Sequence, residues 1–309
     1  MSEHFLVTGA LGCLGAWTLR TLVREGVPAV GFDLGESRHR LELTLDEHEL
    51  EQVELVRGDV TDLDALERAL REHEITHVVH LAALQIPLAK ADPVRGAQVN
   101  VVGTVNVFEA VKKHRDRVRG LAYASSAAVF GAAVDGLVEE DARPTPMTHY
   151  GVHKVANEGA ARVYWLDDGV ASVGLRPFIV YGPGRDQGLT AGPTLAMNAA
   201  ARGEPYRIPF GGRAQYHYAP DAARAFVDAA RACDEGAVVG NLGGPSVHMA
   251  EIVAAIEAVV PDAAGTITFD DVPLPIPGAF EARVLPARVT PIEVGVRETV
   301  EVFRARGPR

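Results

Sequence analysis

The sequence is poor in cysteine and has no long apolar segment. Only two of its 309 residues are cysteines, Cys13 and Cys233, and they form no CxxC pair. Neither a disulfide framework nor a cysteine metal site is expected, and a reducing compartment fits this composition. No apolar run approaches the ~20 residues that cross a bilayer, and the first residues lack the regions of a signal peptide. We expect a cytoplasmic protein without a membrane partner.

Positive charge is scarce as well. The chain has 41 Asp and Glu residues against 30 Lys and Arg residues, and its net charge is -11. Because such a surface repels a phosphate backbone, a nucleic-acid partner is not expected. The 47% share of hydrophobic residues is that of an ordinary folded protein. The expected partner is a small-molecule substrate.

Segments of β-branched and apolar residues alternate with helical patterns through the first half of the chain. We predict strands over residues 4–9, 28–33, 53–59, 76–83, 120–126 and 171–177, and helices near 11–25, 63–73, 93–114 and 150–165. The charged stretch between Asp33 and Gln52 is predicted to be a surface excursion. Strands that alternate with helices form parallel sheets covered on both faces. The predicted fold class is α/β, a doubly wound parallel sheet of the Rossmann type.

The composition changes after Arg176, where glycine, proline and other turn residues become frequent. This change predicts a smaller C-terminal lobe that binds the substrate. We assign residues 1–175 to a dinucleotide-binding domain, to which residues 212–243 return. Residues 176–211 and 244–309 form the predicted substrate-binding lobe.

A glycine-rich turn follows the first predicted strand. Gly9, Gly12 and Gly15 lie between that strand and the helix after it. Their missing side chains permit a tight turn, close approach of the backbone to a pyrophosphate, and packing of helix on strand, while the helix start offers free N–H donors. Asp33 ends the next strand, close to the spacing that accompanies this turn. We therefore prefer a dinucleotide site over a merely structural turn.

The residue at the end of the second strand also bears on which cofactor binds. Asp33 can accept hydrogen bonds from both adenosine ribose hydroxyls and would repel a 2'-phosphate. This favours NAD over NADP. Arg38 and Arg40 follow shortly after and keep NADP open as the alternative.

Three polar residues point to proton and hydride chemistry. Tyr150 and Lys154 are four residues apart, so both lie on one face of the predicted helix. A nearby ammonium favours the phenolate and lowers the tyrosine pKa toward the working range. An isolated YxxxK pair would more simply be an amphipathic helix. Here Ser126 ends another strand at the edge where doubly wound folds bind ligands and can hydrogen-bond a reacting oxygen. The predicted catalytic residues are therefore Ser126, Tyr150 and Lys154.

The order and spacing of these motifs resemble the extended short-chain dehydrogenases/reductases, in particular the NAD-dependent epimerase/dehydratase family. The similarity runs nearly end to end and is carried by TGALGCLG, GDVTD, HLAA, NVVGTVNVFEA, YASSAAVFG, YGVHKVANE, LRPFIVYGPG, YAPDAARA and TPIEVGVRET. It implies that Tyr150 exchanges the hydroxyl proton while the nicotinamide exchanges the hydride. Ser126 would orient the substrate oxygen, and Lys154 would hold the nicotinamide ribose and lower the tyrosine pKa.

The resemblance also implies further cofactor contacts beyond the glycine turn and Asp33. Asp59 and Val60 would contact the adenine, and Leu81, Ala82 and Ala83 would line the cofactor. Asn100 would have a structural role near the active site, and Phe178 would neighbour the nicotinamide. Leu14, in the glycine turn, is a further expected contact.

Several positions depart from the family pattern. Nucleotide-sugar dehydratases of the family carry an Asp-Glu pair where this chain has Ala127 and Ala128. Eliminating water needs that added acid and base, so a dehydratase is not expected. Members that bind nucleotide diphosphate sugars usually have Asn where this chain has Ile179, and an Arg one position away from Arg213. Neither diphosphate contact is expected at its usual position, although Arg213 is close enough to substitute.

We therefore predict an NAD-dependent oxidoreductase acting on a secondary alcohol or ketone of a free sugar, sugar acid or polyol. The alternative is a UDP-sugar epimerase that holds NAD tightly, since both activities use the same three residues. A third reading, a regulatory protein that kept the cofactor fold, is disfavoured by the intact Ser126, Tyr150 and Lys154. Gln85 and Arg185 are candidate substrate contacts, and a loop-stabilising role is an equal alternative for each.

Two further expectations concern metals and assembly. His149 and His153 are four residues apart, but no third ligand has a recognisable spacing, so no metal site is predicted. From the family resemblance, the helices near residues 93–114 and 150–165 are expected to pair across a two-fold axis in a homodimer.

Overall fold

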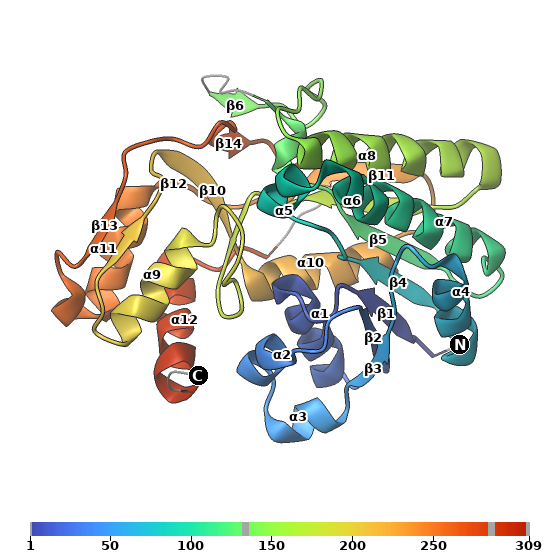
Figure 1. The fold of residues 1–309 in the computed structure, drawn as a ribbon, viewed down its shortest axis with the longest axis horizontal. Helices are drawn as coiled ribbons and strands as arrows, with labels where there is room; N and C mark the ends of the chain where they lie inside the picture. Colours follow the sequence, from blue (N-terminus) through green and yellow to red (C-terminus); the bar gives the residue numbers. More distant parts are fainter. Residues whose placement is uncertain (1, 132–135, 284–287, 307–309) are drawn as a thin grey trace.

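The computed structural model describes residues 2–131, 136–283 and 288–306. Its centre is a seven-stranded sheet in the order β11-β7-β5-β4-β1-β2-β3, in which every pairing is parallel (Figure 1). This confirms the predicted doubly wound sheet. The strands are β1 (Phe5–Thr8), β2 (Ala29–Asp33), β3 (Glu54–Arg57), β4 (His77–His80), β5 (Gly120–Ala124), β7 (Ser172–Arg176) and β11 (Ala237–Asn241).

Helices cover both faces of this sheet. On one face α1 (Cys13–Arg24) packs against α10 (Ala219–Arg231), and on the other α7 (Gly103–Lys113) lies between α4 (Leu63–Glu72) and α8 (His149–Asp168). Strands β1, β4 and β7 are buried along their whole length. This two-sided burial explains why the central residues of each of these strands are apolar. The strand order reverses between β1 and β4, and such a reversal opens a crevice at the carboxyl ends of the strands.

The helix predicted over residues 93–114 is divided into three parts. It consists of α6 (Pro93–Ala97), a π-helical turn, η1 (Gln98–Val102), and α7. The wider turn carries the buried Asn100, which bonds to the backbone of the neighbouring loop. Single π turns of this kind often occur near functional sites, and periodicity alone cannot reveal them.

The remaining elements around the sheet are short or sharply capped. The stretch after Asp33 forms α2 (His39–Thr44) and α3 (Glu47–Glu51), and α5 (Ile86–Ala91) follows β4. At the start of α8, the Thr148 hydroxyl accepts a hydrogen bond from the Gly151 N–H at 3.0 Å, and Gly169 ends the helix with φ of 67°. These caps fix where the helix that carries the predicted catalytic tyrosine begins and ends.

A second body with its own core lies to the left in Figure 1. Its sheet has the order β12-β10-β8, and Tyr181, Met197, Tyr216, Ile252 and Val296 are buried in its core. Its elements are β8 (Ile179–Tyr181), α9 (Gly192–Ala201), β9 (Tyr206–Ile208), β10 (Arg213–Tyr218), β12 (Ser246–His248), α11 (Met249–Val259), η3 (Pro261–Ala263), β13 (Ile267–Phe269) and α12 (Ile292–Arg306). A two-stranded pair, β6 (Leu137–Val138) with β14 (Ala279–Phe280), and η2 (Ala127–Val129) complete the fold.

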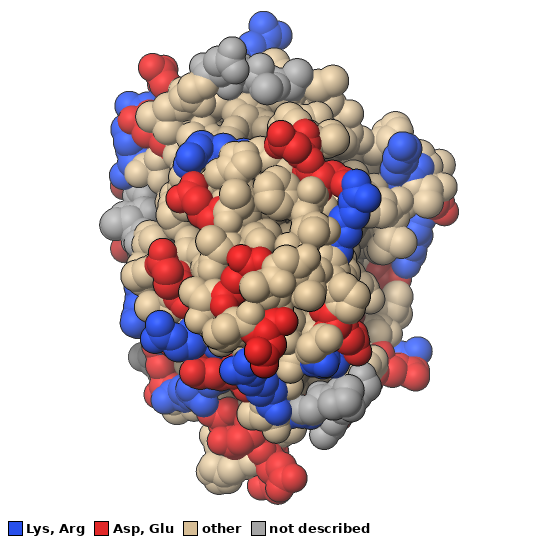
Figure 2. Space-filling view, turned by 90° about the vertical axis from the view of Figure 1, so that its left-hand side faces the viewer, with Lys and Arg blue, Asp and Glu red and all other residues tan. Residues whose placement is uncertain are grey.

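The chain passes between the two bodies more than once. Within the returning segment 212–243, β10 pairs with the lobe strands β8 and β12, whereas α10 and β11 pack with the large sheet. The return to the large sheet thus begins at Ala219, six residues after the start of β10 at Arg213. Within the described ranges, no helix is long and apolar enough to cross a membrane. On the lobe side shown in Figure 2, basic and acidic side chains are mixed among the described residues.

Candidate active site

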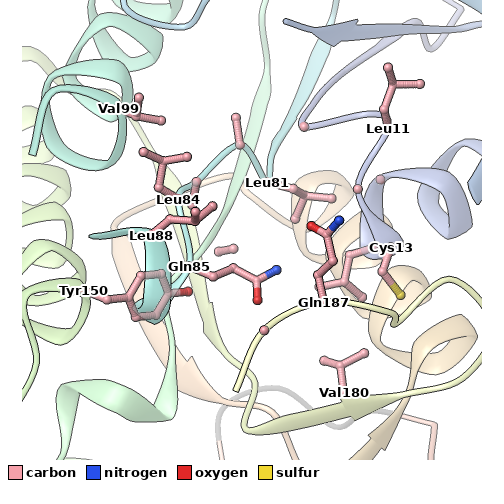
Figure 3. A pocket seen from close by; sticks show the side chains of 18 of the residues that line it. Leu11, Cys13, Leu81, Leu84, Gln85, Leu88, Val99, Tyr150, Val180 and Gln187 are labelled. Atoms are coloured by element: carbon pink, nitrogen blue, oxygen red, sulfur yellow. The ribbon is translucent and has the colours of Figure 1, made fainter. Parts of the chain in front are cut away.

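A cavity of about 770 Å³ runs along the carboxyl ends of the strands of the large sheet and reaches the lobe. Figure 3 shows side chains from the loop after β4, from α8 and from the loop after β8 around it. Every predicted site residue except Asn100 lines this cavity: Gly9, Gly12, Leu14, Gly15, Asp33, Asp59, Val60, Leu81, Ala82, Ala83, Gln85, Ser126, Tyr150, Lys154, Phe178 and Arg185. The tertiary structure therefore brings the glycine turn and the three polar residues into one space.

The glycine turn closes so tightly that side chains do not fit. Gly9 has φ of 68°, and a Cβ atom there would lie 2.7 Å from the backbone nitrogen of Ala82. A Cβ atom on Gly15 would lie 2.2 Å from the carbonyl oxygen of Gly9. Helix α1 starts directly after Gly12, which offers no side-chain cap. The start of the helix is therefore open to an anionic group such as a pyrophosphate.

Asp33 lies beside this turn, at the end of β2. Its two carboxylate oxygens accept hydrogen bonds from the backbone N–H groups of Leu11 at 2.9 Å and Gly35 at 2.8 Å. These bonds hold the carboxylate at the edge of the cavity, where an adenosine ribose would lie in a dinucleotide site.

The two arginines that kept NADP open differ in their surroundings. Arg38 is exposed and does not line the cavity. Arg40 donates to the carbonyl oxygen of Leu11 at 2.9 Å and to Asp186 at 2.6 Å, and His39 also bonds Asp186, at 2.8 Å. The guanidinium of Arg40 is thus already paired, and it ties the loop after β2 to the loop after β8.

Asp59 and Val60 form the cavity wall after β3. Asp59 accepts hydrogen bonds from the Thr61 N–H at 2.9 Å and from Arg95 at 3.0 Å. Burial raises the pKa of the Asp59 carboxyl, but these hydrogen bonds and the charge of Arg95 outweigh that effect, so the pKa is lowered. Asp59 is therefore ionised at neutral pH and can accept a hydrogen bond from an adenine amino group.

Asn100 supports the site from outside the cavity. Its side-chain oxygen accepts from the Leu84 N–H at 2.7 Å, and its amide donates to the Leu84 carbonyl oxygen at 2.9 Å. This paired contact holds the loop of Leu81, Ala82 and Ala83 against the turn. Asn100 was expected among the cofactor contacts, but it does not itself line the cavity.

The predicted catalytic residues converge at the other end of the cavity. Lys154 lies with its Nζ 5.3 Å from the centroid of the Tyr150 ring, and it donates to the carbonyl oxygen of Ala124 at 2.6 Å. Ser126 follows β5, accepts a hydrogen bond from the Ala128 N–H at 3.1 Å, and lines the same cavity as Tyr150. The phenol, hydroxyl and ammonium thus come from two elements that meet at one point.

The electrostatics of this group depend on burial and on a nearby arginine. Burial raises the pKa of the Tyr150 phenol, while the charge of Arg185 and the hydrogen bond from Ser126 act to lower it. Burial lowers the pKa of Lys154 to about 8, against the opposing charge of Glu158. The family resemblance implies that Lys154 lowers the tyrosine pKa, and in this structure the charge of Arg185 acts in that direction. The ammonium of Lys154 lies near the same ring and is held by the carbonyl of Ala124.

Glu158 supports this site from outside the cavity and was missed by the sequence reasoning. It forms a buried, two-pronged ion pair with Arg176, with both N–O distances at 2.7 Å, and it accepts from the Ser125 hydroxyl at 2.5 Å. Glu158 is four residues after Lys154, so the stripe of Tyr150 and Lys154 continues by one more helical turn. That spacing is the signal that could have identified it.

Gln85 and Arg185 meet on the substrate side of the cavity. Arg185 donates to the side-chain oxygen of Gln85 at 3.3 Å and to the Thr190 hydroxyl at 3.0 Å. In Figure 3, Gln85 and Tyr150 both point into the cavity, as does Gln187 from the opposite wall. Neither Thr190 nor Gln187 carried a sequence signal. Apolar side chains of the lobe and its approaches complete this end: Phe178, Val180, Leu189, Leu274 and Ile276.

The positions that depart from the family pattern lie mostly away from the cavity. Ile179 is fully buried in the core of the lobe. Arg213 is exposed, donates to the carbonyl oxygen of Ser246 at 2.7 Å and faces Glu251. It does not line the cavity. Ala128 does line the cavity, at the place where a dehydratase would carry an acid or base.

Residues 2–131, 136–283 and 288–306 contain no group of three or more His, Cys, Asp or Glu side chains able to hold a metal ion. His153 is buried, and the amide of Asn100 lies 3.3 Å from its Nδ1. Burial lowers the pKa of His153, so its ring is neutral at pH 7.

Comparison with known proteins identifies the class to which this fold and site belong. A family model, the NAD dependent epimerase/dehydratase family, matches residues 5–243. The chain belongs to this family, whose members are enzymes of the extended short-chain dehydrogenase/reductase type.

The chain also matches individual members of this family. The chain is 30% identical over 182 residues to the UDP-glucose 4-epimerase of Azospirillum brasilense, covering 59% of this chain and 50% of the relative. It is 32% identical over 183 residues to UDP-glucuronate 4-epimerase 2 of Arabidopsis thaliana, covering 58% and 42%. In these matches the chain spans about half the length of each relative.

Solved structures match over nearly the whole chain. The UDP-glucose 4-epimerase of Thermus thermophilus, solved with NAD, superposes with a TM-score of 0.82 at 26% identity, covering 98% of this chain and 99% of that one. MoeE5, solved with UDP-glucose and NAD, gives a TM-score of 0.79 at 26% identity with the same coverage. Both lobes therefore have counterparts in proteins of known structure.

Proposed function

We propose that this protein is an NAD-dependent 4-epimerase of a sugar nucleotide, which oxidises and then reduces one secondary alcohol carbon. The observation that carries the proposal is the single cavity that joins the glycine turn and Asp33 to Ser126, Tyr150 and Lys154. The names of the similar proteins, UDP-glucose and UDP-glucuronate 4-epimerases, support this choice over the small-substrate dehydrogenase favoured by the sequence.

The residues around the glycine turn fit NAD. A Cβ atom on Gly15 would collide with the backbone of the turn, and Asp33 lines the cavity beside it, which supports a role in accepting hydrogen bonds from ribose hydroxyls. The carboxylate of Asp33 and the pairing of Arg40 with Asp186 favour NAD over NADP, since no unpaired arginine lines that part of the cavity for a 2'-phosphate among the described residues. When bound, NAD supplies a carbon that accepts and returns a hydride.

The chain's own residues would move the proton. Tyr150 would take the proton of the substrate hydroxyl on oxidation and return it on reduction, and Ser126 would hold the same oxygen by a hydrogen bond. Lys154 would add positive charge below the phenol ring, which favours the phenolate. Lys154 is buried, whereas Ser126 and Tyr150 are half-buried in the cavity wall, where they can reach a substrate.

The residues that line the cavity also support a second candidate function, a dehydrogenase that oxidises a small hydroxylated substrate with net reduction of NAD. Arg213 lies outside the cavity, and Ile179 is buried in the lobe core. On the substrate side of the described structure, Arg185 is the arginine that lines the cavity. A diphosphate would therefore find fewer charged partners than it needs, whereas a free sugar acid or polyol would not need them.

One experiment tests both candidates. The protein with NAD is incubated with UDP-glucose or UDP-glucuronate and, in separate reactions, with free sugar acids or polyols. The 4-epimer is detected by NMR, and the absorbance of reduced nicotinamide is followed. Product formation without a steady rise in absorbance supports the epimerase, while a sustained rise with a free sugar acid or polyol supports the dehydrogenase. Tyr150→Phe should lower either rate by about 10²- to 10⁴-fold. Tyr164→Phe, on the same helix but bonded to Glu109, is the matched control.

We also propose a homodimer formed through α6 to α8. These helices carry exposed apolar side chains, namely Val94, Val102, Val152, Val163 and Leu166. Pairing across a two-fold axis would bury them in a four-helix interface. Analytical sedimentation that gives a monomer at micromolar concentration refutes this assembly.

A cytoplasmic location is proposed from the cysteines. Both Cys13 and Cys233 are unpaired thiols, as is usual in a reducing compartment. Fractionation of cells that express the protein, followed by immunoblotting, tests this.

A further inference from the structure

The loop after β8 brings a carboxylate to the cofactor end of the cavity. Asp186 lies in this loop, and its Oδ1 atom accepts from Nε of Arg40 at 3.0 Å and from Nη2 of Arg40 at 2.6 Å. The other carboxylate oxygen, Oδ2, lies 2.8 Å from Nε2 of His39. Both oxygens of one carboxylate are thus engaged by side chains from the segment that follows Asp33, although this segment is about 146 residues away in the sequence.

The ion pair of Arg40 with Asp186 is partly withdrawn from solvent. The Arg40 side chain is 14% exposed, and the Asp186 side chain is 36% exposed. Burial raises the pKa of the Asp186 carboxyl, but the hydrogen bonds and charges of Arg40 and His39 outweigh that effect, so the pKa is lowered. The carboxylate is therefore ionised at neutral pH, and it neutralises the guanidinium from within the protein.

Arg40 lies beside the residue that marks the ribose site. Its Nη1 atom donates to the carbonyl oxygen of Leu11 at 2.9 Å, and the N–H of Leu11 donates to Asp33 at 2.9 Å. The guanidinium and the Asp33 carboxylate thus hold the two backbone groups of one residue, and both line the same edge of the cavity. In dinucleotide sites an acidic residue here binds the ribose hydroxyls of NAD, whereas a nearby arginine accommodates the 2'-phosphate of NADP. Arg40 is placed for the second role, but it is already engaged.

The side chains around Asp186 are of the kinds that bind a phosphate group. The Ser37 hydroxyl lies 2.9 Å from Nδ1 of His39, and both residues line the cavity together with Arg40. A hydroxyl, an imidazole and a guanidinium can each donate to an anionic oxygen, and the planar guanidinium matches the paired oxygens of a phosphate or a carboxylate. The carboxylate of Asp186 therefore occupies this set of donors as an internal anion.

We propose that Asp186 is a specificity-determining residue that excludes NADP by occupying Arg40 and His39, which would otherwise bind the 2'-phosphate. Asp33 acts directly on the ribose, whereas Asp186 acts by engaging the donors that a further phosphate would need. NADP would have to displace this carboxylate and would leave it beside the phosphate, where like charges repel each other. The choice of cofactor is thus made partly by the loop after β8, which also lines the substrate end of the cavity through Gln187 (Figure 3). This inference rests on the cofactor site of the proposed function and not on the identity of the sugar.

The test compares two pairs of ligands that differ in the 2'-phosphate alone, NADP against NAD and adenosine 2',5'-bisphosphate against AMP. Dissociation constants are measured by fluorescence titration for the dinucleotides and by calorimetry for the smaller pair. Asp186→Asn keeps the size of the side chain and removes its charge. It should raise the affinity for NADP relative to NAD by at least about tenfold, as one freed charge-assisted hydrogen bond predicts. The ratio for the smaller pair should rise in the same direction.

A second substitution shows whether the gain depends on the freed arginine. Arg40→Gln in the Asp186→Asn background should return the ratio of NADP to NAD affinity to that of the wild type. Asp270→Asn is the matched control, because Asp270 also pairs with an arginine, Arg207, but neither residue lines the cavity. This control should leave the ratio unchanged.

Three outcomes overturn the proposal. They are an unchanged ratio in Asp186→Asn, a gain that survives Arg40→Gln, and a wild-type protein that binds NADP as tightly as NAD. The last comparison needs no variant to fold. All of these measurements are made without turnover, so a raised ratio in a protein that epimerises no sugar nucleotide would refute the proposed epimerase and leave the role of Asp186 standing.

Discussion

Replacing Lys154 with methionine separates the cost of burying a charge from the chemistry that the charge supports. The side chain is 3% exposed, and burial lowers its pKa from 10.5 to about 8. Each pH unit between these values corresponds to about 1.4 kcal/mol, so keeping Lys154 charged inside the fold costs about 3 kcal/mol at pH 7. Methionine fills a similar volume without charge, although the Ala124 carbonyl then loses its donor, at a cost of about 1 kcal/mol.

The expected result is a variant that is more stable than the wild type by about 2 kcal/mol at pH 7 and that has lost its activity. The advantage depends on pH with a definite sign. Below pH 8, Lys154 is charged in both the folded and the unfolded chain, so the full cost is present. Between pH 8 and 10.5 the unfolded chain binds the proton more tightly, so the wild type gains stability relative to the variant as pH rises.

Urea unfolding without cofactor at about pH 7 and about pH 10, followed by circular dichroism, measures both effects. Comparing variant with wild type cancels the titration of the other groups. Lys90→Met changes an exposed lysine on α5 and should alter the unfolding free energy by less than about 0.5 kcal/mol at either pH. A Lys154→Met protein that is less stable at neutral pH, or a difference that does not change with pH, refutes the reasoning.

Three further changes test other parts of the site. Gly15→Ala places a Cβ atom 2.2 Å from a backbone oxygen of the turn and should weaken NAD binding at least about tenfold in a fluorescence titration, whereas Gly159→Ala, with open space around its Cβ, should leave it unchanged. Asp33→Ser should lower the affinity for NAD about tenfold and raise the relative affinity for NADP, measured by the same titration. Glu158→Gln breaks the buried pair with its arginine and should lower the unfolding free energy by about 3 kcal/mol, against less than about 1 kcal/mol for the exposed Glu204→Gln.

Each of these has an outcome that contradicts it. Unchanged NAD affinity in Gly15→Ala would mean that the turn does not face the cofactor. A Glu158→Gln protein as stable as the Glu204→Gln protein would mean that the buried pair contributes nothing. An unaltered preference between NAD and NADP in Asp33→Ser would remove that carboxylate from cofactor selection.

The local patterns of the sequence were sufficient for the sheet and for the main polar residues and the glycine turn of the cavity. Three signals were local: the strand periodicity, the glycine turn, and the four-residue spacing of Tyr150 and Lys154. Each depends on residues within one element or in two adjacent elements, so it can be recognised in a short stretch of sequence. The helix over residues 93–114 was predicted as one piece, whereas Asn100 in its π turn bonds to the backbone of Leu84, which lies outside that helix.

The assignment of residues 212–243 shows the same limit. The strand Arg213–Tyr218 has ordinary strand periodicity, and only its pairing with β8 and β12 places it in the lobe. Pairing partners are chosen by packing across the whole molecule, so a single strand does not reveal the sheet to which it belongs.

The sequence by itself determined the fold class, the family and the positions of the glycine turn and of Ser126, Tyr150 and Lys154. Only the tertiary structure decided that Arg40 is held by Asp186, 146 residues away, and that Arg185 meets Gln85, 100 residues away, in the wall of the same cavity. Whether a charged side chain is paired or left for a ligand depends on such distant neighbours and on the burial that they create. The sequence could therefore place the chemistry, while the folded chain decides which charges are already paired inside the protein.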